Sequence, residues 1–146
     1  MRQVTRLLKL SRTERSVLLY ACMLLNGIRL ALWLLPFNFV RQKLAQISTV
    51  WVCDNPDHSI RVSFIVKAVN IATRYTPGGA KCLVRALTAQ LFLNRYGYSH
   101  QLHIGVAKGA DNTLEAHAWI EYKDHIIVGW LSNLSRFKSL TSEGVK

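Results

Sequence analysis

The sequence predicts an α+β fold in which helices come first and a small antiparallel sheet follows. Apolar residues recur at helical spacing over roughly the first 95 residues, whereas from Leu102 onwards they alternate with polar residues. The chain has 146 residues, half of them apolar, which suffices for one buried core and is too short for two. We therefore expect one compact unit made of an N-terminal helical segment, residues 1–48, and a second region, residues 49–146.

The charge balance is strongly basic. The chain has 19 Lys and Arg against 8 Asp and Glu, a net charge of +11, and residues 1–48 alone hold 8 basic residues and one acidic residue. Such a field favours an anionic partner, whether nucleic acid, a membrane surface or an acidic peptide. The basic residues are spread among apolar stretches and no helix-turn-helix or RNA-binding signature is present, so we expect no nucleic-acid partner.

Three cysteines, Cys22, Cys53 and Cys82, make an odd number, and none belongs to a C-x-x-C pair. A chain of this size does not need disulfides for stability. We therefore expect free thiols and a reducing compartment, that is, a cytoplasmic protein.

The N-terminal segment predicts two helices. Ser11 and Glu14 have the spacing of a capping box, which predicts a helix that begins near Arg12. Pro36 ends or kinks that helix, and residues 37–47 continue as a shorter amphipathic helix.

The apolar run Val17–Leu35 leaves two interpretations open. Its 19 residues could just span a bilayer behind a basic flank. Arg29 lies within the run, however, where a charge costs about 2.5–3.5 kcal/mol on insertion, and Asn26-Gly27 weakens the helix. No small-x-small cleavage site follows the run, which argues against a signal peptide. The run is either a buried helix that covers the C-terminal half, or an exposed apolar face that contacts a membrane or a partner.

The middle of the chain predicts two further helices. A turn cluster, residues 54–57, joins the N-terminal segment to a helix over about residues 59–74. The tight loop at residues 76–79 follows, and residues 80–93 form a nearly all-apolar helix. Cys82 therefore stands in the first turn of a buried helix.

The C-terminal region predicts a small antiparallel sheet. The first strand covers residues 102–106, and the second places Ala116, Ala118 and Ile120 on one face and His117 and its alternating neighbours on the other. A tight turn at Lys123-Asp124 leads into a third strand, residues 125–131, and the polar tail from residue 132 is expected to be loose.

Cys82 is the candidate nucleophile. A cysteine among apolar residues is often an inert core residue, because burial raises its pKa. The first turn of a helix, however, stabilises a thiolate, Lys81 adds a cation beside it, and Gly78-Gly79 allows a substrate to approach. Cys22 and Cys53 lack this setting and are interpreted as structural.

His117 is the candidate general base. Acyl transfer by a thiolate needs an imidazole and a group that orients its ring. His117 is preferred because small neighbours leave room around it and Trp119 can exclude water from the same face. Three other histidines, at positions 58, 100 and 125, are interpreted as solvated or satisfied residues.

A metal site is the first alternative, since His100, His103, His117 and Cys82 offer nitrogen and sulfur ligands. On a strand, His100 and His103 point to opposite faces, so their spacing does not chelate. We expect no metal and no cofactor.

These residues resemble a known family. The runs 81–87 (KCLVRAL), 102–106 (LHIGV) and 115–121 (EAHAWIE) look like the leader peptidases of lasso-peptide biosynthesis, which are transglutaminase-like cysteine proteases. The leucine-rich helix that ends at LLPF, residues 34–37, also resembles the N-terminal region of this family. The resemblance covers nearly the whole chain and implies a papain/transglutaminase-like fold, with the cysteine helix packed on a small antiparallel sheet.

The resemblance also implies a function. Cys82 would be the nucleophile and His117 the general base, then acid, in cleavage of the leader peptide from a ribosomally made precursor. A separate ATP-using cyclase would then join the released amine to a side-chain carboxylate. The chain has no room for a leader-recognition domain, which suggests a stand-alone protease subunit with a separate recognition protein as its partner.

The chain departs from the family pattern at one position. The third residue of the triad is commonly an Asp about a dozen positions after the histidine, and that position is Gly129 here. Asp124, Asn133 or a backbone carbonyl could orient the ring instead. The missing Asp also leaves open a non-catalytic, transglutaminase-like scaffold.

Overall fold

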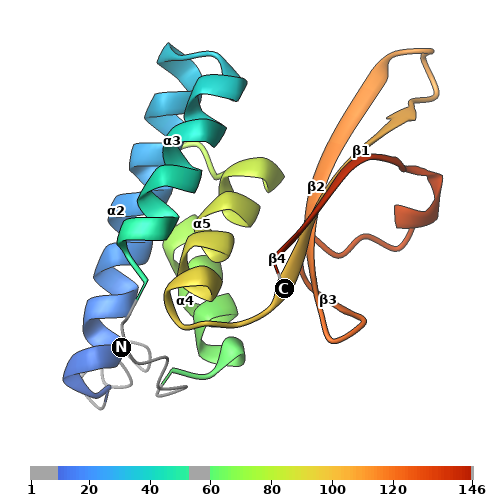
Figure 1. The fold of residues 1–146 in the computed structure, drawn as a ribbon. Coiled ribbons are helices and arrows are strands. Elements are labelled where there is room, and N and C mark those ends of the chain that lie inside the picture. The colour runs from blue at the N-terminus through green and yellow to red at the C-terminus, as the bar shows by residue number, and fades with distance from the viewer. Residues whose placement is uncertain (1–9, 53–59, 146) are drawn as a thin grey trace.

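The structure is a computed structural model that describes residues 10–52 and 60–145. Within these ranges a layer of four helices packs against one face of a four-stranded antiparallel sheet (Figure 1). The α+β prediction is confirmed. The predicted turn cluster at residues 54–57, Cys53 and His58 lie outside the described residues. The helices are α2 (Arg12–Leu34), α3 (Phe37–Val50), α4 (Val62–Arg74) and α5 (Cys82–Arg95).

Helix α2 begins at the capping box that the sequence predicts. The Glu14 backbone N–H donates to Ser11 Oγ at 3.1 Å, and the Ser11 backbone N–H donates to the Glu14 carboxylate at 2.8 Å. The helix ends at Leu34, and Pro36 caps the start of α3. The capping box therefore marks the start of this helix, and the proline two residues after Leu34 marks its end.

One stripe of α2 is buried and the other is exposed. Val17, Ala21, Leu25 and Ile28 lie in the core that α2 shares with α4 and α5. Trp33, in contrast, is 80% exposed. In the described part of the chain, α2 is the one helix long and apolar enough to cross a membrane, judged by length and composition. Its buried stripe nevertheless belongs to the core of the protein.

Arg29 explains how α2 carries a charge inside its apolar run. Its guanidinium donates a hydrogen bond from Nη1 to the backbone carbonyl of Pro77. This contact joins α2 to the loop that leads into α5, so the charge has a polar partner within the protein.

Helix α5 is the centre of the core. Leu87, Leu91, Phe92 and Leu93 are each at most 2% exposed. Helices α2 and α4 pack on one side of α5 and strand β2 packs on the other (Figure 1). A helix buried on both sides explains the nearly continuous apolar run in its sequence.

The sheet has the strand order β3-β2-β1-β4, and all neighbours are antiparallel. The turn between β2 and β3 is the predicted one, since Lys123 and Asp124 have positive φ angles of 49° and 61°, as a two-residue hairpin turn requires. The strands are β1 (His100–Lys108), β2 (Leu114–Tyr122), β3 (His125–Val128) and β4 (Lys138–Val145).

Two predictions about the C-terminal region are wrong. Strand β3 ends at Val128 and not at residue 131, because Gly129 adopts a φ of +81° and turns the chain off the sheet. The tail from residue 132 is not loose. It forms a short 3₁₀ turn, Leu134–Arg136, and then β4, which pairs with the free edge of β1 and satisfies backbone groups there.

We expect a buried histidine to make stability fall in mild acid. His100 is 3% exposed and its Nδ1 donates to the Tyr98 carbonyl at 2.8 Å, while burial lowers the pKa of the ring below its ordinary value. The unfolded chain binds a proton near pH 6.5 and the folded chain resists it, so the free energy of unfolding decreases as pH falls below about 6.5.

Urea unfolding between pH 8 and pH 5 measures this effect. The His100→Phe variant should lose part of the decrease, whereas His125→Phe, at an exposed strand end, should retain it. Equal pH dependence in wild type and His100→Phe would contradict this role of His100.

Candidate active site

Cys82 is the first residue of α5, as the sequence predicts. Lys81 is the N-cap residue, and no side chain accepts a hydrogen bond from the first turn. The two residues of the preceding turn, Gly78 and Gly79, have φ angles of +73° and +72°. The thiol is free and half-buried in the first turn of the helix.

Cys22 is in a different setting. It lies half-buried in the middle of α2, where burial raises the pKa of its thiol. A raised pKa leaves little thiolate at neutral pH, which agrees with a structural role.

The ring of His117 is held by a backbone carbonyl. Its Nε2 lies 2.7 Å from the carbonyl oxygen of Gly129. Because a carbonyl only accepts hydrogen bonds, Nε2 carries the proton and Nδ1 of the neutral ring has a free lone pair. The ring also packs near Phe137, with ring centroids 5.5 Å apart. The structure thus sets the tautomer that a general base acting through Nδ1 needs.

Gly129 can present this carbonyl because it has no side chain. A Cβ at this position would lie 2.5 Å from the carbonyl oxygen of Ala118, closer than two such atoms can approach. Its φ of +81° also lies in the left-handed region that favours glycine. The position at which the family pattern has an Asp therefore supplies a backbone acceptor here.

Trp119 forms a wall beside His117. Its ring is 6% exposed and stacks at an interplanar angle of 15° to the His117 ring, with centroids 6.3 Å apart. On its other side it stacks on His103, with centroids 5.2 Å apart. The ring lies over Gly105, where a Cβ would come within 2.9 Å of it. The sequence correctly places Trp119 on the same face as His117.

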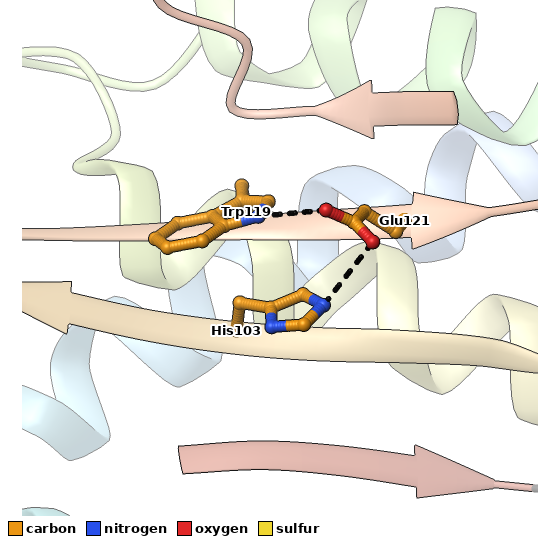
Figure 2. A network of polar contacts seen from close by, with 3 residues as sticks. All are labelled: His103, Trp119 and Glu121. Atoms are coloured by element: carbon orange, nitrogen blue, oxygen red, sulfur yellow. Dashed lines mark hydrogen bonds and ion pairs between the residues drawn. The ribbon is translucent and has the colours of Figure 1, made fainter. Parts of the chain in front are cut away.

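Glu121 contacts two of the three stacked rings, those of Trp119 and His103. Figure 2 shows its carboxylate beside the edges of the Trp119 and His103 rings: one oxygen accepts from Trp119 Nε1 at 3.4 Å, and the other lies 3.4 Å from His103 Nε2. These contacts fix the Trp119 ring and so limit the positions open to the His117 ring.

The structure does not bring Cys82 and His117 together. Ala118 and Ile120 of β2 face the core that contains α5, so His117 points to the opposite face of the sheet. In Figure 2 the side chains of His103, Trp119 and Glu121, which share that face, lie in front of the sheet and the helices lie behind it. Among the described residues there is no hydrogen bond between the Cys82 thiol and the His117 ring.

The structure also does not bring Asp124 to His117. Asp124 lies exposed in the β2–β3 turn, more than five residues along β2 from His117, which is roughly 17 Å at the rise of a strand. Asn133, the other side chain considered, is exposed just before the 3₁₀ turn. Of the acceptors left open by the sequence, the backbone carbonyl is the one that contacts the ring.

Two residues that complete the surroundings of His117 are not predicted from the sequence. Phe137 contacts its ring, and Arg136 forms an ion pair with Glu115, two residues before His117 on β2. Both lie after residue 132, in the segment that the sequence predicts to be loose. Within the described residues, no group of three metal-ligating side chains lies close enough to hold a metal ion.

A comparison with protein families assigns the chain. The model described as the Transglutaminase-like superfamily matches residues 22–142, a range that includes both Cys82 and His117. The chain belongs to the transglutaminase-like superfamily. No curated protein and no solved structure matches the sequence. The superfamily includes cysteine proteases, which makes cysteine-dependent acyl chemistry the class of activity to consider for this transglutaminase-like chain.

We expect the Gly129→Ala substitution to be strongly destabilising. The left-handed φ costs about 1–2 kcal/mol for an alanine, and the contact with the Ala118 carbonyl adds to it, so the loss should be about 3 kcal/mol or more. Urea unfolding measures this loss as a lower transition midpoint.

Two other glycines provide matched controls. Gly79 has a similar φ but open space around it, so Gly79→Ala should cost only about 1–2 kcal/mol. Gly27 lies inside α2 with nothing near it, so Gly27→Ala should stabilise the protein by about 0.5–1 kcal/mol. Equal losses for Gly129→Ala and Gly79→Ala would show that the Ala118 contact is unimportant.

Proposed function

We propose that this transglutaminase-like protein is a cysteine peptidase that removes the leader peptide from a ribosomally made lasso-peptide precursor. Cys82 acts as the nucleophile and His117 as the general base, then acid. The observation that carries the proposal is the position of Cys82 at the N-terminus of α5, in a member of a superfamily that includes cysteine proteases. The tautomer set by the Gly129 carbonyl supports the role of His117.

The reaction has two steps. The Cys82 thiolate attacks the carbonyl carbon at the leader–core junction, the C–N bond breaks, and the protonated His117 ring gives its Nδ1 proton to the leaving amine. A water molecule then loses a proton to Nδ1 and attacks the thioester, which releases the leader carboxylate and the Cys82 thiol. The released core peptide keeps a free amino terminus, which a separate ATP-using cyclase would consume.

Both steps need the thiol and the imidazole to share a proton. Since Cys82 begins one of the helices and His117 points to the face of the sheet away from the helices, the β1–β2 hairpin must rearrange relative to α5 before catalysis. We assign this rearrangement to the docking of the precursor leader together with a separate leader-recognition protein. The subunit is then inactive alone and active in the complex, in a cytoplasmic setting, with the exposed face of α2 available for peripheral membrane contact.

A non-catalytic scaffold is the second candidate function. The separation of Cys82 from His117 favours it, because a scaffold needs no assembled dyad. It would bind the leader or the recognition protein and leave cleavage to another chain.

Cleavage of a precursor decides between the two candidates. Precursor peptides encoded near this protein are incubated with the full chain, with and without the purified recognition protein, and the products are read by mass spectrometry. We expect cleavage at one junction only in the complex, and its loss in Cys82→Ala and His117→Ala. Binding of the leader with identical products from wild type and both variants would overturn the peptidase proposal.

Alkylation of Cys82 tests the rearrangement separately. For the subunit alone, iodoacetamide should modify the Cys82-containing peptide at the same rate in wild type and in His117→Ala, because the ring does not contact the thiol. With leader and recognition protein present, the wild-type rate should rise about tenfold and the His117→Ala rate should not. An unchanged wild-type rate in a complex that cleaves the precursor would show that no such rearrangement occurs.

A further inference from the structure

A cavity of about 850 Å³ lies between α2, the α2–α3 corner and the segment that leads into α5. This volume lies within the range of ligand-binding pockets. Residues of α2, α3 and α5 form its apolar wall: Leu30, Trp33, Phe37, Leu83 and Val84.

The polar lining of the cavity is cationic. Arg29 and Lys81 both line it, and none of the described lining residues is acidic. The Arg29 guanidinium uses one N–H for the Pro77 carbonyl and keeps further donors. Asn26, the third polar lining residue, donates a hydrogen bond from its amide Nδ2 to the Cys22 carbonyl at 2.8 Å. An occupant that complements these walls combines an apolar group with a negative charge.

The cavity adjoins the candidate nucleophile. Lys81 and Leu83, the residues on either side of Cys82 in the sequence, both line it. Gly78 and Gly79, whose conformations shape the entry to α5, line it as well. A peptide held in this cavity would therefore run past the N-terminus of α5.

We propose that this cavity binds a peptide segment in which a bulky apolar residue stands next to an acidic one. The inference rests on the proposed function for the choice of a peptide as ligand, and on the lining residues for its chemistry. The apolar side chain packs against Trp33 and Phe37, and the carboxylate pairs with Arg29 and Lys81. The concave shape favours a peptide over a bilayer, which would need a flat or convex apolar face.

Peptide pools test the proposal on the full-length Cys82→Ala chain, which cannot turn over substrate. The three pools are acetylated, amidated hexapeptides with fixed central pairs of Phe-Glu, Phe-Lys or Ser-Glu and random residues elsewhere. We expect the chain to retain the Phe-Glu pool about tenfold better than either of the others, about 1.4 kcal/mol in binding free energy. Equal retention of the three pools overturns the proposal.

Substitutions assign the binding to the cavity. In the same background, Lys81→Glu should reverse the preference between Phe-Glu and Phe-Lys, whereas Lys67→Glu, at an exposed position of α4 outside the cavity lining, should leave it unchanged. Trp33→Ala should lower retention of the Phe-Glu pool, and Met23→Ala, at an exposed position of α2 outside the lining, should not. A Lys81→Glu variant that keeps the original preference places the binding elsewhere.

Three further outcomes are informative. If vesicles of phosphatidylcholine and phosphatidylserine bind the chain through Trp33 while no pool is selected, this face contacts lipid and the proposal is wrong. Selection of the Phe-Glu pool by a chain that never cleaves a precursor supports the cavity and overturns only the peptidase function. Precursor cleavage without pool selection supports the peptidase function and overturns the cavity proposal.

Discussion

The burial of α5 on both sides is the constraint on which the rest of the structure depends. The apolar side chains of this helix fill the space between α2, α4 and the sheet, and a truncation such as Phe92 to alanine typically costs about 3–5 kcal/mol in such a core. Because α5 cannot shift without loss of this packing, its N-terminus is a fixed point. Cys82 is held there at the first residue of α5, and the loop before it is joined to α2 by Arg29.

The same burial decides which face of the sheet is available for chemistry. Ala118 and Ile120 must face α5, and the alternation of a strand then turns His117 and Trp119 outward. On that outer face the His117 ring needs an acceptor, and the chain provides one by returning through Gly129, whose φ and close contact with Ala118 exclude a side chain. An aspartate at this position would have to give up this backbone path. The departure from the family pattern and the carbonyl acceptor are therefore one feature and not two.

Local signals explain which elements could be predicted from the sequence. The capping box at Ser11 and the turn at Lys123-Asp124 depend on residues a few positions apart, and both are found as expected. Strand β4 depends on the free edge of β1, a partner more than thirty residues away, and its polar sequence carries no trace of that pairing. An edge strand with one solvated face can be polar, so composition alone reads as a loose tail.

The candidate site shows how far residue patterns reach. They correctly place Cys82 in the first turn of a helix and Trp119 beside His117, because both follow from periodicity within one element. The patterns predict that Ala118 and Ile120 share one face and His117 the other. They do not predict that α5 packs on the face of Ala118 and Ile120. Ala118, the residue after His117, faces the core that contains α5, so His117 and the cysteine that begins α5 cannot meet without a change in packing. The sequence allows a backbone carbonyl as the acceptor but does not say which one, since every residue has a carbonyl group.

Arg29, the charged residue within the apolar run of α2, forms a hydrogen bond that joins two parts of the structure. In a bilayer its charge would cost about 2.5–3.5 kcal/mol, and on the surface of a lone amphipathic helix it would interrupt the apolar face. Here it reaches the Pro77 carbonyl and so ties the longest helix to the turn before Cys82, at the wall of the cavity. A hydrogen bond of this kind typically contributes about 1.5–3 kcal/mol when one partner is charged and the pair is buried, and less where the pair is exposed to solvent as here. An anion in the cavity would attract the same guanidinium, so occupancy of the cavity and the position of the turn before the nucleophile depend on one side chain.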